Sequence, residues 1–251
     1  MDSSLPIKEL RVRQLMGYTL LDQSLPSLLG KGNTIVVHTV NPHSWVCASR
    51  DTNFRHALLN GDLLVADGVG LLLASLILQR APIHRTTGSD MWLSLMQELQ
   101  RTAGRCFYLG STPEVLSKLE HQVHKSFPGV TAGSYSPPFC AEFSNEHIEE
   151  MIKVVNAFKP DVLFLGITAP RQEKLAEQLR GRVTPQVMVA IGAVFDFVAG
   201  SQPRAPKIMR QMGLEWLYRL IREPRRMWRR NFISTPRFLL AVFILWLRGG
   251  G

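Results

Sequence analysis

Short apolar runs that are typical of β-strands alternate along this chain with segments of helix length, and this alternation constrains the fold more than any other feature. The spacing of apolar residues favours helices in the longer segments, and the connections between the two kinds of segment are short. Strands are expected at residues 34–40, 63–66, 106–109, 130–135, 162–165 and 187–191. Repeated βα units of this kind predict an α/β fold, a Rossmann-like and mostly parallel sheet with helices on both faces.

The longer segments carry signals that mark helix ends. Asn60-Gly61 is expected to end one helix, Thr112-Pro113 to start another, and Ser144 to cap a third. Helices are expected at residues 44–59, 69–79, 88–102, 114–125 and 145–158, with a further helix from residue 170. The apolar run Val69–Leu78 is well short of the roughly 20 residues that span a bilayer, so we expect it to form a buried helix.

Composition places the chain among folded, intracellular proteins. Of its 251 residues, 45% are hydrophobic and 20% are charged, which is ordinary for a globular domain. Cys47, Cys106 and Cys140 show no C-x-x-C spacing, which suits a reducing cytosol better than a disulfide framework or a zinc site. The first residues, Met1–Ser4, lack the basic and apolar pattern of a signal peptide. A cytoplasmic protein is therefore expected.

The whole net charge of +9 lies in residues 201–251. Residues 1–200 contain 18 Lys and Arg against 18 Asp and Glu, whereas the remainder contains 11 basic residues against Glu215 and Glu223. This basic segment also ends in an apolar run, Phe238–Leu247, which is too short to span a bilayer. We expect one domain at 1–200 and a C-terminal appendage at 201–251 that binds peripherally to the anionic inner leaflet of the cytoplasmic membrane.

The basic segment has helical spacing. Five of its arginines recur at short intervals: Arg219, Arg222, Arg226, Arg229 and Arg230. They are expected to share one helix face, with Pro224 ending or kinking a segment. A solvated helix face is one alternative, and a non-catalytic nucleotide-sensing module with a nucleic-acid-binding tail is another. The neighbouring tryptophans and apolar tip favour a membrane, and no nucleic-acid partner is expected.

Candidate site residues follow the predicted strands, because ligands bind at the carboxyl ends of parallel strands. Asp67 follows one strand directly, and Gly68 and Gly70 beside it would let a ligand approach the backbone. Its carboxylate could serve as a general base, or it could cap the helix that starts near Val69.

Two further loops carry candidates with weaker signals. Thr39 and Asn41 could hydrogen-bond a sugar or a uracil edge, or could form the turn before Pro42. Gly110 and the residues after it could offer backbone N–H groups to a phosphate, or could form an ordinary βα loop.

Several common chemistries have no sequence support. The chain lacks a G-x-G-x-x-G fingerprint, a Walker A motif and a G-x-S-x-G elbow, so a nicotinamide cofactor, ATP and nucleophilic hydrolase chemistry are not indicated. It also lacks the D-x-D pair with which many sugar-nucleotide enzymes hold a metal. Neither a cofactor nor a metal is therefore expected, and arginines such as Arg85 would neutralise a diphosphate instead.

Four blocks of the sequence resemble those of the WecG/TagA/CpsF glycosyltransferases, over about residues 36–230. They are Thr39-Val40-Asn41, Asp67–Gly70, Pro170–Glu173 and a long block from Gly192 to Arg226. The family usually has Gly-x-Gly before Pro-x-Gln-Glu, whereas Thr168 replaces the second of these glycines here. Members of this family transfer a sugar from a nucleotide donor to a polyprenyl-diphosphate-linked sugar in the assembly of bacterial surface glycans.

The resemblance implies a mechanism and a set of site residues. It implies an inverting, metal-independent transfer from a UDP-sugar, with Asp67 as catalytic base and Arg85 facing the phosphates. Thr39, Asn41 and Gln172 would line the active site, and the appendage would dock on the membrane and deliver arginines. The full set expected to bind substrate is Thr39, Asn41, Gly68, Gly110, Gln172, Glu173, Asp196, Arg204, Arg219, Arg226 and Arg229.

Overall fold

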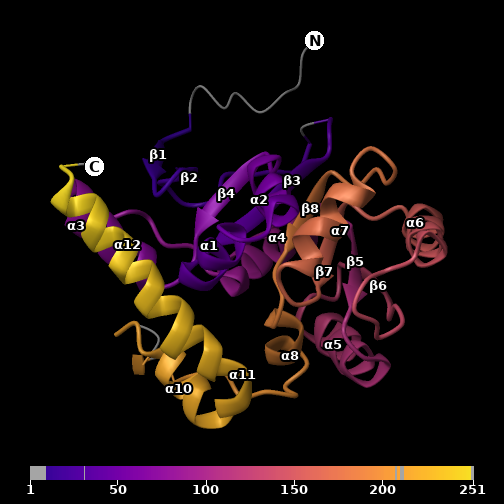
Figure 1. Cartoon of the computed structure of the whole chain (residues 1–251). Helices are drawn as coiled ribbons and strands as arrows, with labels where there is room; N and C mark the ends of the chain where they lie inside the picture. Colours follow the sequence, from indigo (N-terminus) through magenta and orange to yellow (C-terminus); the bar gives the residue numbers. More distant parts are fainter. Residues whose placement is uncertain (1–9, 31, 207, 210–211, 250–251) are drawn as a thin grey trace.

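The computed structural model describes residues 10–30, 32–206, 208–209 and 212–249, apart from the side chain of Arg226. Within them, one eight-stranded sheet has the order β1-β2-β4-β3-β8-β7-β5-β6 (Figure 1). All neighbouring strands pair in parallel except β1 and β2. The strands are β1 (Val12–Leu15), β2 (Tyr18–Leu21), β3 (Ile35–Val40), β4 (Leu63–Ala66), β5 (Arg105–Gly110), β6 (Thr131–Tyr135), β7 (Val162–Gly166) and β8 (Val187–Ala190).

Helices connect the parallel strands and cover both faces of the sheet, which confirms the predicted α/β fold. In the body of the protein they are α1 (Pro42–Ala48), α2 (Thr52–Leu59), α3 (Val69–Gln79), α4 (Gly88–Thr102), α5 (Pro113–Ser126), α6 (Asn145–Phe158), α7 (Arg171–Leu179) and α8 (Val194–Val198). The predicted caps are confirmed, because Thr112 accepts from the backbone N–H of Val115 and Ser144 from that of His147.

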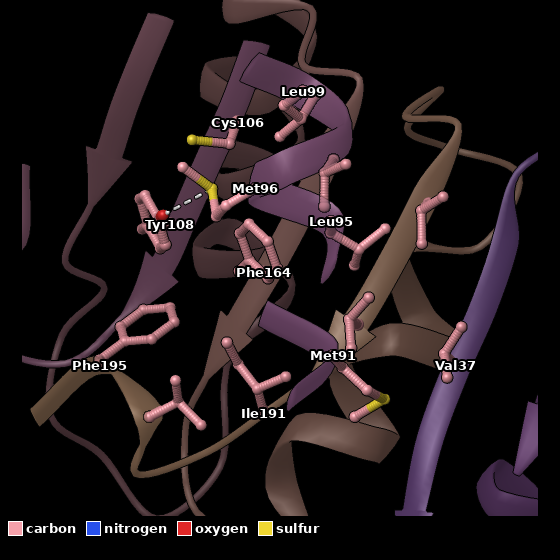
Figure 2. Packing of buried hydrophobic residues seen from close by; sticks show 14 of the residues in the cluster. Val37, Met91, Leu95, Met96, Leu99, Cys106, Tyr108, Phe164, Ile191 and Phe195 are labelled. Atoms are coloured by element: carbon pink, nitrogen blue, oxygen red, sulfur yellow. Dashed lines mark hydrogen bonds between the residues drawn. The ribbon is translucent and has the colours of Figure 1, made fainter. Parts of the chain in front are cut away.

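Strand side chains alternate between the two faces, as the period of a strand requires. In β7, Val162 and Phe164 join the core beneath α4 and α5, whereas Leu163 and Leu165 join the core beneath α6 and α7. Figure 2 shows the first of these cores, where Tyr108 stacks on Phe164 with ring centroids 5.2 Å apart. The central strands of the sheet, β3, β4, β5, β7 and β8, are buried on both faces, which explains their nearly continuous apolar sequences.

The structure corrects the expected helix at 44–59. Asp51 breaks this segment into α1 and α2, because its carboxylate accepts from the backbone N–H of Phe54, 3.0 Å away, and so caps a new helix. The apolar spacing continues through both helices, since both pack on the same side of the sheet. Periodicity alone therefore joined two helices that a short polar turn separates.

The expected burial of the 69–79 helix is only half right. Leu71, Ala74 and Ser75 of α3 are buried, but Leu73, Leu76 and Ile77 are exposed. This helix therefore presents an apolar face to its surroundings.

The N-terminal hairpin of β1 and β2 was not predicted from the sequence. Its strands have four residues each and pair antiparallel across a two-residue turn, Met16-Gly17. Both turn residues have positive φ, 52° and 85°, which is the geometry of a type I′ turn. The turn has methionine where asparagine is usual, so the sequence lacks the Asn-Gly signal by which such a hairpin is recognised.

The basic segment forms α10 (Glu215–Arg222), α11 (Pro224–Arg229), a π-helix η2 (Arg230–Ser234) and α12 (Thr235–Leu247). Glu223 interrupts the helix with non-helical backbone angles directly before Pro224, as expected for that proline. The prediction of a single arginine face is therefore wrong, because the arginines belong to successive helices.

The expectation that the apolar tip is too short to span a bilayer also needs correction. The turns of α11, η2 and α12 join, and within the described residues Met227–Leu247 is one helix of 21 residues. An 18-residue stretch of it has a mean hydropathy of 1.2, so by length and composition the helix could cross a membrane. One side of this helix nevertheless packs on the body. Phe238 and Val242 are buried against α1 and α3, and the ring of Phe238 lies 5.5 Å from that of Trp45.

Candidate active site

A cavity of about 440 Å³ lies at the carboxyl ends of four central strands, β3, β4, β7 and β8. The loops after these strands form its floor and walls, and residues of the C-terminal segment form its remaining side. Nine of the predicted site residues line it: Thr39, Asn41, Asp67, Gly68, Arg85, Gln172, Glu173, Arg204 and Arg219. Thr168, which replaces a glycine of the family pattern, lines it as well.

Asp67 stands at the end of β4, where its backbone N–H donates to the carbonyl of Val40 at 2.8 Å. Gly68 occupies the N-cap position of α3 with φ of 86°, and no side chain caps this helix. The structure therefore does not use Asp67 as the helix cap, which was the alternative role. The half-buried carboxyl is left facing the cavity.

The surroundings of Asp67 come from both halves of the sequence. Burial raises the pKa of the Asp67 carboxyl above its ordinary value. The positive charges of Arg230, Arg85 and Arg219 act in the opposite direction, and the negative charge of Glu215 adds to the increase. The raised pKa makes the Asp67 carboxyl a better proton acceptor than an ordinary exposed aspartate.

Arg85 is held beside Asp67 by the backbone. It forms an isolated parallel bridge with Ala66, and the N–H of the next residue, Thr86, donates to the carbonyl of Ala66 at 3.0 Å. The segment before α4 thus extends the sheet by one bridge and brings the guanidinium to the cavity wall.

Asn41 performs the turn-forming role that the sequence left open. Its Oδ1 accepts from the backbone N–H groups of His43 and Ser44, at 3.0 Å each, and so caps α1. Thr39 and Asn41 both line the cavity, so this capping holds the end of β3 in place at the site.

Gln172 and Glu173 in the first turn of α7 form a buried polar pair. Gln172 Nε2 donates to Glu173 Oε1 at 2.9 Å, and burial raises the pKa of the Glu173 carboxyl to about 7. Among the described residues, neither Gln172 Oε1 nor Glu173 Oε2 has a hydrogen-bond partner. Both residues line the cavity, so a bound ligand could satisfy these two atoms.

The C-terminal segment contributes charged and aromatic groups to the same cavity. Arg204 lies 3.8 Å from Glu215, and the guanidinium of Arg219 lies 5.5 Å from the ring centre of Phe197. Sequence reasoning did not select several lining residues of this region: Glu215, Trp216, Arg230 and Asn231. Arg230 belongs to the arginine row, but its spacing could not show which members of the row face inward.

Other predicted residues do not join this group. In the described part of the chain, the cavity wall does not include Gly110, Asp196 or Arg229. Gly110 pairs with Gly166 between β5 and β7, Asp196 lies in α8, and Arg229 is exposed. The side chain of Arg226 lies outside the described part.

Comparison with known proteins decides the family. The model of the glycosyl transferase WecG/TagA/CpsF family matches residues 6–250, nearly the whole chain. The chain belongs to this family. It is therefore a glycosyltransferase, and the alternative of a non-catalytic nucleotide-sensing module is wrong.

Similar curated proteins have one activity in their names. The chain is 30% identical to an N-acetylglucosaminyldiphosphoundecaprenol N-acetyl-β-D-mannosaminyltransferase of Bacillus spizizenii, over 89% of this chain and 81% of the relative. A protein of the same name from Bacillus subtilis is 27% identical over 82% of this chain and 78% of the relative. A third, from Staphylococcus aureus, is 25% identical over 84% and 80%.

Proposed function

We propose that this glycosyltransferase moves a hexose or an N-acetylhexosamine, including the uronic acid form, from a UDP-sugar to a polyprenyl-diphosphate-linked sugar, with inversion at the anomeric carbon. The names of the relatives support an N-acetylglucosaminyl-diphosphoundecaprenol acceptor and an N-acetylmannosaminyl donor as the first pair to test. Such a reaction belongs to the synthesis of bacterial surface polysaccharides.

The observation that carries the proposal is the meeting of the Asp67 carboxylate with several arginines in a single cavity. Asp67 lies at the end of β4, and Arg85 reaches the same cavity from the body. The C-terminal segment adds Arg204, Arg219 and Arg230. Transfer from a sugar nucleotide uses this combination, because a base activates the acceptor hydroxyl while positive charges stabilise the departing diphosphate.

In the proposed mechanism, Asp67 accepts the proton of the attacking acceptor hydroxyl. The hydroxyl oxygen forms a bond to the anomeric carbon from the face opposite the diphosphate. The bond from that carbon to the diphosphate oxygen breaks, and its electron pair leaves with UDP. A single displacement of this kind inverts the anomeric centre.

The arginines would stabilise the negative charge that develops on the leaving diphosphate. Arg85 and Arg219 act on Asp67 electrostatically, so they are near enough to share a substrate with it. In this proposal they supply what a divalent metal supplies in other sugar-nucleotide enzymes, and the reaction needs no metal and no cofactor.

The acceptor's lipid implies a membrane location. We propose that the enzyme is cytoplasmic and peripheral, with residues 201–251 docked on the anionic inner leaflet. The charge of +9 in this segment and the exposed apolar residues of α12 support that placement. The burial of Phe238 and Val242 against the body supports a peripheral helix over a spanning one, because crossing the bilayer would break these contacts.

A donor screen tests the proposed activity. The purified chain is incubated with UDP-ManNAc, UDP-ManNAcA, UDP-GlcNAc or UDP-glucose and an N-acetylglucosaminyl-diphospho-lipid, with and without EDTA, and the product mass is measured. Transfer of one sugar that persists in EDTA is expected. Activity that disappears in EDTA and returns with a divalent cation would contradict the metal-free mechanism, and no product with any UDP-sugar would contradict the proposed donor class.

A further inference from the structure

The apolar face of α3 is unusual for a helix in the body of a soluble enzyme. Leu73, Leu76 and Ile77 are 45%, 42% and 44% exposed, and their spacing of three and four residues places them on one stripe. Arg80, also exposed, continues the same stripe at the end of the helix. A contiguous exposed apolar stripe on a folded domain marks an interaction surface.

A second exposed apolar stripe lies on the neighbouring helix. α12 packs alongside α3, although about 160 positions separate them in the sequence (Figure 1). Phe238 and Val242 face the body and are buried. The exposed apolar residues of α12 are Leu239, Leu240, Phe243, Ile244, Trp246 and Leu247.

The cavity meets these two helices at its rim. Leu73 of α3 and Leu239 of α12 both line the cavity and are both exposed. The edge of the active site therefore borders the apolar residues of both helices. An acceptor whose sugar enters the cavity would leave its lipid beside Leu73 and Leu239.

The charges around this surface select the occupant. Arg237 and Arg248 of the C-terminal segment are exposed at the two ends of α12, and Arg80 is exposed at the end of α3. Arginines around an apolar centre fit the headgroups and acyl chains of an anionic bilayer. A second copy of this chain would instead bring the same positive charges against each other.

We propose that α3 and α12 together form one membrane-docking surface, so that an anionic phospholipid bilayer contacts the catalytic body as well as the C-terminal segment. This inference rests on the membrane association proposed above and extends it to the body. The cavity then opens at the level of the bilayer surface, where Leu73 and Leu239 receive the first part of the acceptor's lipid.

The test compares two double variants of the full chain. Leu76→Glu with Ile77→Glu alters the α3 stripe without touching the cavity wall. Leu59→Glu with Leu93→Glu is the matched control, because these leucines are equally exposed on α2 and α4. Flotation with phosphatidylglycerol–phosphatidylcholine vesicles measures partitioning, and transfer to a short water-soluble acceptor measures catalysis.

We expect the α3 variant to partition about tenfold or more weakly than the wild type, because two large apolar side chains no longer enter the bilayer. The control should partition like the wild type, and all three proteins should share one rate on the soluble acceptor. Wild-type binding by the α3 variant would overturn this inference alone, whereas a wild type that does not bind vesicles would overturn the membrane association itself.

Oligomeric state, measured by light scattering, tests the other occupant. If the wild type is a dimer, and the α3 variant is a monomer that binds vesicles normally, the stripe is an interface between copies and the inference is wrong.

Discussion

His43 Nδ1 lies 2.8 Å from Ser234 Oγ, and this hydrogen bond joins α1 of the body to η2 of the C-terminal segment across 191 positions of sequence. Ser234 is buried, and His43 lines the cavity. The first two residues of η2, Arg230 and Asn231, also line the cavity. The contact therefore holds the segment that completes the active site.

Loss of this hydrogen bond should weaken the docking of the segment. We expect Ser234→Ala to lower the free energy of unfolding by about 1 kcal/mol, the usual contribution of such a bond, and to raise KM for both substrates. Denaturant titration and steady-state kinetics measure the two effects. Ser126→Ala, at an exposed position at the end of α5, is the control. Unchanged stability and KM in Ser234→Ala would remove the contact from this role.

The same contact should depend on pH. Burial lowers the pKa of His43 below its ordinary value of 6.5, and the charge of Arg230 lowers it further. The unfolded chain therefore binds the proton more readily, so the contribution of His43 to stability is complete above pH 6.5 and is lost as the pH falls below it. His43→Gln should show a smaller loss of stability over this range than the wild type, measured by unfolding at several pH values. Buried His38 remains in both proteins, so a difference reports on His43.

Asp67→Asn tests the proposed base. The amide keeps the size of the side chain but cannot accept the acceptor's proton, so kcat should fall by roughly 10²–10⁴-fold. The circular dichroism spectrum should be unchanged, since the Asp67 side chain caps no helix. UDP binding should also be unchanged. Glu114→Gln, at an exposed position of α5, is the control. Near-normal turnover would exclude Asp67 as the base.

Arginines that line the cavity should affect catalysis more than arginines that are exposed elsewhere on the C-terminal segment. Arg219→Ala and Arg230→Ala should each lower kcat on a soluble acceptor by about 10- to 1,000-fold, because each removes positive charge beside the leaving diphosphate. Arg225→Ala, at an exposed position in α11, should retain wild-type kcat on that acceptor. Equal effects in all three variants would indicate a general electrostatic contribution instead of a local one.

Glu173 should make the protein less stable as the pH rises. Burial raises its pKa from 4.5 to about 7, so the folded state holds the proton more tightly than the unfolded state. The stability that depends on the neutral carboxyl is complete below pH 4.5 and declines as the pH rises through 7. Glu173→Gln removes this ionisation, so its stability relative to the wild type should increase between these pH values. Thermal unfolding across the range measures it, and a constant difference would contradict the raised pKa.

The sequence alone determined most of the local elements and predicted the end of the sheet at which the cavity lies. Strands buried on both faces have continuous apolar sequences, and caps such as Thr112 and Ser144 act through neighbouring residues, so both can be recognised locally. The position of Asp67 at the cavity was predictable for the same reason, because it directly follows β4 and lies at the carboxyl ends of the parallel strands.

Only the tertiary structure decided which distant residues complete the site. Spacing placed Arg219 and Arg229 in one row, but the interruption at Glu223 and the packing of Phe238 against Trp45 bring the first to the cavity and leave the second exposed. The exposure of the α3 stripe could not be predicted from the sequence either, because an apolar helix has the same composition whether a core or a bilayer covers it. Burial depends on neighbours that are remote in sequence, and for α3 that neighbour is α12.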